Sequence, residues 1–278
     1  MEGAAAAKRR AQNAKAQALQ RVQHLRALVS KRKANVQYLQ RVYEGGEAWL
    51  GCTVLSVQDL RQYCSAVPKQ RTVSFLYLAL SLGKLLHASP HISPGLPLVR
   101  ALSQLVEEWE YYFSNAAVQS VKFMTARTSA CLYPQYSHRV TDLQASLDSS
   151  THHSSPQQAD EGASPATKVS IGKATPQIYK FNGQIVFEHL LTPHVAFELD
   201  YVEVFGALCV VLSSTYDAFL MSQDCSSLAH VYEAVLRLDA RFKHHVLSIV
   251  AKELTAFCQE ANALAFEMLT TESVPSWR

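Results

Sequence analysis

Cysteine is scarce in this chain of 278 residues, and the few that occur are far apart. They form no C-x-x-C pair and have no regular spacing: Cys52, Cys64, Cys131, Cys209, Cys225 and Cys258. This scatter argues against the disulfide framework of a small secreted domain. Several of these residues, such as Cys209, stand inside apolar helical patterns. We therefore expect buried free thiols in a reducing compartment.

The motifs of the common nucleotide-binding and hydrolytic enzymes are missing as well. There is no G-x-G-x-x-G, no phosphate-binding loop and no G-x-S-x-G. Ser81 and Lys84 match the S-x-x-K pattern of acyl enzymes, but its S-D-N and K-T-G companions are absent. His87 and His91 have the spacing of a helical zinc pair, yet Pro90 interrupts the helix that such a pair requires. We predict no catalytic residue, no metal site and no cofactor, with an enzyme of an unfamiliar helical class as an alternative.

No segment has the pattern of a secretory signal or of a membrane span. The N-terminus lacks an apolar region after its basic residues. The most apolar runs are residues 72–83, which are too few to cross a bilayer, and residues 202–212, which are flanked by acids. We expect both runs to form buried core helices, and we expect a cytoplasmic protein that is at most peripheral to a membrane.

Charge is distributed unevenly along the chain. Residues 1–50 contain ten Lys/Arg and three acids, a net charge of +7, whereas the whole chain has a net charge of +3. The body that follows is therefore mildly acidic. The basic residues of this N-terminal arm are Lys8, Arg9, Arg10, Lys15, Arg21, Arg26, Lys31, Arg32, Lys33 and Arg41. Such an arm is typical of proteins that meet anionic surfaces or partner helices.

The same arm carries an apolar stripe. Its members fall at spacings of three and four, with Arg32 in one position of the series: Val22, Leu25, Val29, Val36, Leu39 and Tyr43. This a/d pattern is about three heptads long and predicts a helix over residues 1–45 that docks on a partner or forms a coiled coil; the alternative is that it is the first helix of the fold itself. Gly45 and Gly46 end the helix.

Helical patterns continue through residues 46–142. Residues 51–87 predict one or two helices that Pro68 interrupts. Pro97 begins an amphipathic helix whose spacing persists to about residue 128. We expect the acids of this helix to lie on its solvated side: Glu107, Glu108 and Glu110.

The composition changes between residues 143 and 176. This stretch is rich in Ser, Thr, Pro and Gln and has almost no large apolar residue, so it predicts a disordered linker. His152 and His153 lie within it without further ligands nearby, and we interpret them as solvated.

A β-hairpin is predicted at residues 178–187. Asn182 and Gly183 supply the two positive φ angles of a type I′ turn, with Phe181 opposite Gln184 and Tyr179 opposite Val186. We expect this hairpin to cover the helical body; edge addition to a strand of a partner is the alternative.

The C-terminal part, residues 177–278, is otherwise helical. Residues 198–222 predict a buried helix. Residues 228–270 contain neither Gly nor Pro, and their apolar spacing predicts a long packed seam, either one helix or two that bend near residues 239–245. A basic cluster at this bend indicates a solvated face with local ion pairs, or alternatively an anion site or pH-sensitive contact: Arg241, Lys243, His244 and His245.

These patterns predict a mainly α fold, an irregular multi-helix bundle with one β-hairpin and a disordered linker. We expect residues 46–142 and 177–278 to pack together as one domain.

The predicted function is that of a non-enzymatic adaptor, a subunit of a larger intracellular assembly that docks on protein partners through amphipathic helices and the arm. In the first alternative, residues 8–41 bind an anionic surface such as nucleic acid, cytoskeleton or membrane. In the second, residues 1–35 are a presequence and the protein is mitochondrial.

Overall fold

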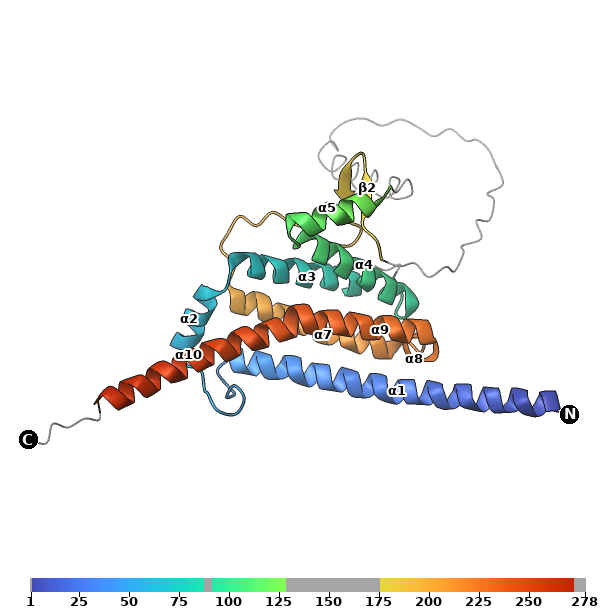
Figure 1. Cartoon of the computed structure of the whole chain (residues 1–278), viewed down its shortest axis with the longest axis horizontal. Coiled ribbons are helices and arrows are strands. Elements are labelled where there is room, and N and C mark those ends of the chain that lie inside the picture. Colours follow the sequence, from blue (N-terminus) through green and yellow to red (C-terminus); the bar gives the residue numbers. More distant parts are fainter. Residues whose placement is uncertain (1, 88–91, 129–175, 273–278) are drawn as a thin grey trace, which may run out of the picture. The chain divides into compact units, whose positions relative to one another are not determined.

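The computed structural model describes residues 2–87, 92–128 and 176–272. This part of the chain is mainly α-helical with one β-hairpin (Figure 1), which confirms the predicted fold class. The linker predicted at residues 143–176, with His152 and His153, lies outside the described residues except for its last position. Internal contacts divide the chain into a helical unit, Met1–Phe113 with His189–Arg278, and a second unit, Ser114–Glu188. These boundaries differ from those of the predicted halves, because helices from both halves share the helical unit.

The helical unit is built in layers of packed helices. Its elements are α1 (Glu2–Tyr43), α2 (Val57–Ala66), α3 (Lys69–His87), α4 (Leu96–Tyr112), α7 (Tyr201–Met221), α8 (Asp224–Ser227), α9 (Ala229–Phe242), the π-helical turn η1 (Lys243–Leu247) and α10 (Ser248–Glu272). Helix α1 packs against α7 and α8, while α3 packs on α7 and α4 packs on α9 (Figure 1). The central helices α7 and α9 thus separate α1 from α3 and α4, and their side chains form much of the core.

Local sequence signals set several helix ends as predicted. Helix α1 ends at Tyr43, and Gly45 follows with φ +72°, a conformation that glycine adopts without strain. The amides of Gly45 and Gly46 bond the last carbonyls of α1, as in a glycine C-cap. Ser56 caps α2 in a reciprocal capping box with Asp59. The C-terminal seam has a π-helical turn, η1, that joins α9 to α10 close to the position at which one alternative placed a bend.

The amphipathic helix expected from Pro97 to about residue 128 is in fact two helices. Helix α4 ends at Tyr112, and α5 spans Ala116–Thr125. The side chain of Asn115 accepts a hydrogen bond from the Val118 amide and caps α5. The apolar spacing runs through this break, so the pattern alone could not show it.

The second unit contains α5 and a small sheet. The hairpin pairs β2 (Tyr179–Phe181) with β3 (Gln184–Val186) in the predicted register, and the turn residues Asn182 and Gly183 have φ angles of 48° and 75°. The strand β1 (Arg127–Thr128) adds a parallel neighbour to β2 that the sequence analysis missed. A strand of two residues is too short to show a period, which explains the omission.

A buried ion pair joins three helices of the helical unit. Arg32 of α1 donates from Nε and Nη2 to the two carboxylate oxygens of Asp239 on α9, at 2.6 and 2.8 Å. Tyr216 of α7 donates its hydroxyl to the same carboxylate at 2.9 Å. All three side chains are buried. The bond to Asp239 raises the pKa of Arg32 against the opposing effect of burial, so the pair stays charged.

Helix α7 is apolar enough to resemble a membrane span, yet part of it is buried inside the protein. An 18-residue window within it reaches a mean hydropathy of 1.7, which by length and composition would suffice for a membrane span. Half of that window is buried inside the protein, as in the core helix of a soluble bundle. The prediction of a buried helix near residues 198–222 agrees with this burial.

The cysteines of the described residues are free thiols. Cys209, Cys225 and Cys258 are buried as expected, whereas Cys52 is exposed. Burial raises the pKa of Cys209 to about 12, so this thiol stays protonated at neutral pH.

Removing Arg32 is expected to destabilise the helical unit strongly. The variant Arg32→Met leaves Asp239 buried without its cation, which should lower the free energy of unfolding by about 3–5 kcal/mol. Replacing the whole cluster, as Arg32→Met with Asp239→Leu and Tyr216→Phe, should recover most of that loss. Urea denaturation followed by circular dichroism measures both. The exposed residue Arg237 provides the control, since Arg237→Met should change stability by no more than about 0.5 kcal/mol.

Candidate functional site

The apolar stripe of the N-terminal arm packs within its own chain. Its side chains are buried except for Val22, which is half-buried: Leu25, Val29, Val36, Leu39 and Tyr43. Tyr43 contacts the rings of Tyr201 and Phe205 on α7. The stripe thus belongs to the core of the helical unit, which agrees with the alternative that the arm is the first helix of the fold and not with a stripe that is exposed for docking.

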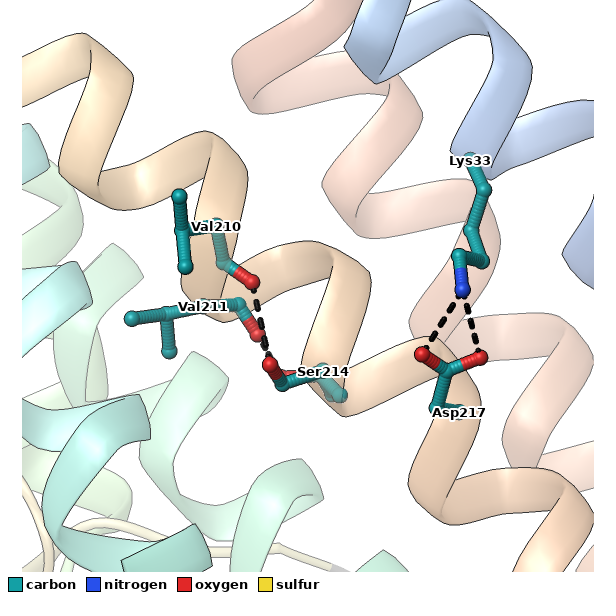
Figure 2. Close-up of polar contacts among 6 residues, drawn as sticks. Lys33, Val210, Val211, Ser214 and Asp217 are labelled. Atoms are coloured by element: carbon teal, nitrogen blue, oxygen red, sulfur yellow. Dashed lines mark hydrogen bonds and ion pairs between the residues drawn. The ribbon is translucent and has the colours of Figure 1, made fainter.

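Several cations of the arm also act within the chain. Besides Arg32, Lys33 donates to both carboxylate oxygens of Asp217 on α7 at 2.8 and 2.7 Å (Figure 2). Arg21 donates to the carbonyls of Ser226 and Ser227 at the end of α8. Arg41 pairs with Glu47 in the loop after α1, at 2.5 Å. The prediction that all ten cations face an anionic surface is corrected for these four, since each binds an acceptor of its own chain.

The remaining cations of the arm divide into two groups. Lys15, Arg26 and Lys31 are exposed on α1. Lys8, Arg9 and Arg10 belong to the first turns of α1, although their side chains are not among those described. These six residues remain candidates for binding.

Helices α1 and α9 run in the same direction in a fixed register. Arg21 reaches Ser226, His24 contacts the hydroxyl of Tyr232, and Arg32 reaches Asp239. The sequence separations of these pairs are 205, 208 and 207. Separations that differ by no more than three over 11 residues of α1 indicate that α1 runs parallel to the path of α8 and α9, and α10 continues this path beyond η1 (Figure 1).

In this register, the start of α1 and the end of α10 each extend beyond the region in which the helices lie side by side. Residues 2–20, here named the α1 overhang, precede the first contact at Arg21. Residues 259–272, the α10 overhang, follow Cys258, the last buried position of α10. Asn262 is bonded to Thr53 of the loop after α1, near the base of this overhang.

The α10 overhang carries large apolar side chains at its surface. The seam of α10 is fully buried at Leu254 and continues with the same spacing to Leu264 and Met268. Those two side chains are 55% and 65% exposed. Phe266, on another face of the helix, is 70% exposed. The sequence predicted a seam packed along its whole length, and the structure corrects this for the last turns.

A cluster of acids and bases lies where α4 meets η1. Arg241 contacts Glu107 at 2.7 Å and Glu110 at 3.3 Å, and His245 lies 3.2 Å from the same Glu110 oxygen. The predicted local ion pairs of the basic cluster are thus present, but they join two helices. The acids of α4 were expected on the solvated side, and this expectation is wrong because Glu107 and Glu110 face α9 and η1 while Glu108 is buried against residues 189–190.

Glu108 is the clearest omission of the sequence analysis. Its side chain is 0% exposed. One oxygen accepts the amides of His189 and Leu190 at 2.9 and 2.8 Å, and the other accepts from Gln104 at 2.9 Å. The carboxylate thereby holds the extended segment after the second unit against α4. A single acid within a run of three gives no signal of this role.

A group of tyrosine hydroxyls occupies another part of the core. Tyr43 donates to Tyr63 at 3.1 Å, and the ring of Tyr201 lies against both. Burial raises the pKa of all three hydroxyls, so they remain protonated and none serves as a base at neutral pH.

An open depression of about 390 Å³ is lined by the start of α3 and residues 195–199. Lys69 and Glu198 form an exposed ion pair at its edge, 3.1 Å apart. Within the part of the chain that the structure describes, no three His, Cys, Asp or Glu side chains are grouped so as to hold a metal ion. The overhangs, with exposed apolar or basic side chains, therefore form the candidate site.

Loss of the Glu108 carboxylate should release the segment at residues 189–190. The variant Glu108→Leu leaves two buried amides without their acceptor, at about 1–3 kcal/mol for each. Glu108→Gln keeps an accepting oxygen and should cost less. Urea denaturation gives the stability, and hydrogen exchange at the Leu190 amide gives the local effect. Equal exchange in the wild type and Glu108→Leu would contradict this role; Glu203→Gln on α7 is the matched surface control.

His245 should make the stability depend on pH. Burial, and then the charges of His244 and Arg241, lower the pKa of His245 in the folded state. The unfolded chain binds the proton more readily, so this contribution to stability is complete above about pH 6.5 and is lost as the pH falls through the folded pKa.

The measurement is the urea midpoint between mildly alkaline and mildly acidic pH. His245→Gln should flatten the decrease on acidification, whereas the exposed His230→Gln should not. An unchanged slope in His245→Gln would contradict the assignment.

Comparison with known proteins finds no match: no family model fits the chain, and no curated protein or solved structure is significantly similar to it.

Proposed function

We propose that this protein is a non-enzymatic subunit of an intracellular protein assembly, and that its overhanging helix ends contact the partner. The observation that carries the proposal is the exposed continuation of the α10 seam at Leu264 and Met268. Side chains that keep the spacing of a buried seam, yet lie outside the bundle, are typical of a helix that packs on another molecule.

The energetic argument rests on the size of the exposed side chains. Burying a Leu, Met or Phe side chain is worth about 1.5–3 kcal/mol. Leu264 and Met268, which share one face, together thus provide a substantial part of the binding free energy of a helix docked on a partner.

The cytoplasm is the compartment that fits this proposal best. The mitochondrial alternative requires the removal of residues 1–35. That cleavage would take Leu25, Val29 and Arg32 out of the core and leave Asp239 buried without its cation. An N-terminal helix so deeply involved in the fold argues against a presequence.

Binding to an anionic surface is the second candidate function. The exposed side chains of Lys15, Arg26 and Lys31 support it, since they lie along one helix with no acid between Glu2 and Glu44. Such binding would weaken steeply with salt.

Affinity capture tests the proposed function. The tagged full-length chain and the variant Leu264→Asp/Met268→Asp are expressed in the same cells, and the bound proteins are identified by mass spectrometry. The variant should lose most of the proteins that the wild type retains, because two charges replace the apolar contact. Val54→Asp provides the control, since Val54 is equally exposed but lies outside the overhang. Equal recovery with both variants would contradict the proposal.

A further inference from the structure

The register of the helical unit gives it two different ends. Helix α1 and the path of α9 and α10 run in parallel, with the α1 overhang at the start of the pair and the α10 overhang at its finish (Figure 1). A second copy that is shifted along the helix direction would bring its α1 overhang beside the α10 overhang of the first. The two helices would then run in parallel, as α1 and α9 already do within one chain.

The lengths of the overhangs match. The α10 overhang has 14 residues, or two heptads, which is about 21 Å of helix at 1.5 Å per residue. The α1 overhang, residues 2–20, is longer and can accompany it along its whole length. Its alanines allow a close approach of the two helices.

The charges of the overhangs are opposite. The α10 overhang contains three Glu and no Asp, Lys or Arg. Two of them, Glu260 and Glu267, are seven residues apart, and each stands directly before a position of the apolar seam, as does Glu253 earlier in α10, which pairs with Arg71 of α3 at 3.0 Å. Such positions flank the seam of a helix pair and meet the flanking positions of the partner. The α1 overhang has four basic residues and one acid, and Lys8 and Lys15 are also seven residues apart.

The same charges argue against pairing between two identical overhangs of different copies. Two α10 overhangs would bring like charges together at every flanking position, which destabilises a helix pair. Two α1 overhangs would do the same with cations. Only the mixed pair combines opposite charges with the exposed apolar side chains of α10.

We infer that this protein associates with itself head to tail, with the α10 overhang of one copy packed in parallel on the α1 overhang of the next. The contact is heterologous, so only the two terminal copies of a growing chain each keep one unused overhang. This inference rests on the proposed function in that it names the partner as a second copy.

Sedimentation velocity of the purified full-length chain tests the association. The average sedimentation coefficient should rise continuously with concentration at low salt and should fall when salt is added, because screening weakens the charge pairs. A wild-type chain that remains monomeric at its highest soluble concentration in low salt would overturn the inference.

Two charge reversals identify the contacting helices. The variant Glu260→Lys/Glu267→Lys makes both overhangs basic, and Lys8→Glu/Lys15→Glu makes both acidic. Each variant alone should bind itself at least about tenfold more weakly than the wild type. An equal mixture of the two should associate again, because each α10 overhang then meets an α1 overhang of opposite charge.

Glu233→Lys is the control, since Glu233 lies exposed on α9 away from both overhangs, and it should associate like the wild type. Self-association that persists in either reversed variant alone, or a mixture that stays monomeric, would overturn the inference. The outcome for the proposed function is separate: a monomeric wild type whose captured partners still depend on Leu264 and Met268 would leave that proposal standing.

Discussion

The buried pair of Arg32 and Asp239 is the contact on which the arrangement of the helical unit depends. Two charges taken out of water are stable only when their geometry is well matched, and here both guanidinium bonds and the Tyr216 hydroxyl satisfy the carboxylate. A shift of α1 by one turn, about 5.4 Å, would break these bonds and leave both charges buried. We therefore interpret the pair as a device that selects one register of α1 against α7 and α9, more than as a source of net stability.

That register gives the basic N-terminus two distinct roles. The cations at positions 21, 32, 33 and 41 bind carbonyls and carboxylates of the same chain and fix the helix in place. The basic residues before position 21 lie on a part of α1 that has no counterpart on α8 or α9. The net charge of the whole arm does not separate these two roles, because it counts every cation regardless of the acceptors that the fold brings near it.

The features that the sequence predicted are those decided by neighbouring residues. Asn182 and Gly183 determine the hairpin register through their own φ angles, and Gly45 ends α1 in the same local way. The roles of Glu108 and Arg32 were not predictable, because each depends on a partner more than 80 residues away that only the packed fold supplies. An apolar series interrupted by Arg32 looks like an imperfect stripe until Asp239 is placed opposite to it. The same holds for the candidate site. The apolar spacing predicted the α10 seam, but it could not show which turns of the seam are buried and which are exposed.

The point at which the apolar seam of α10 becomes exposed depends on its neighbours and not on its own sequence. The apolar spacing of α10 is the same before and after Cys258, so the intrinsic tendency of the helix to pack does not change there. What changes is the neighbour: the earlier turns contact Trp49 of the loop after α1, Tyr63 of α2 and Arg71 of α3, and Asn262 is bonded to Thr53 of the same loop. The exposed turns keep the apolar spacing, and the acids Glu260 and Glu267 beside it favour a basic helix as the surface that covers them. Such a helix begins each copy of this chain, and for that reason the physics that orders one molecule internally also favours contact with the next.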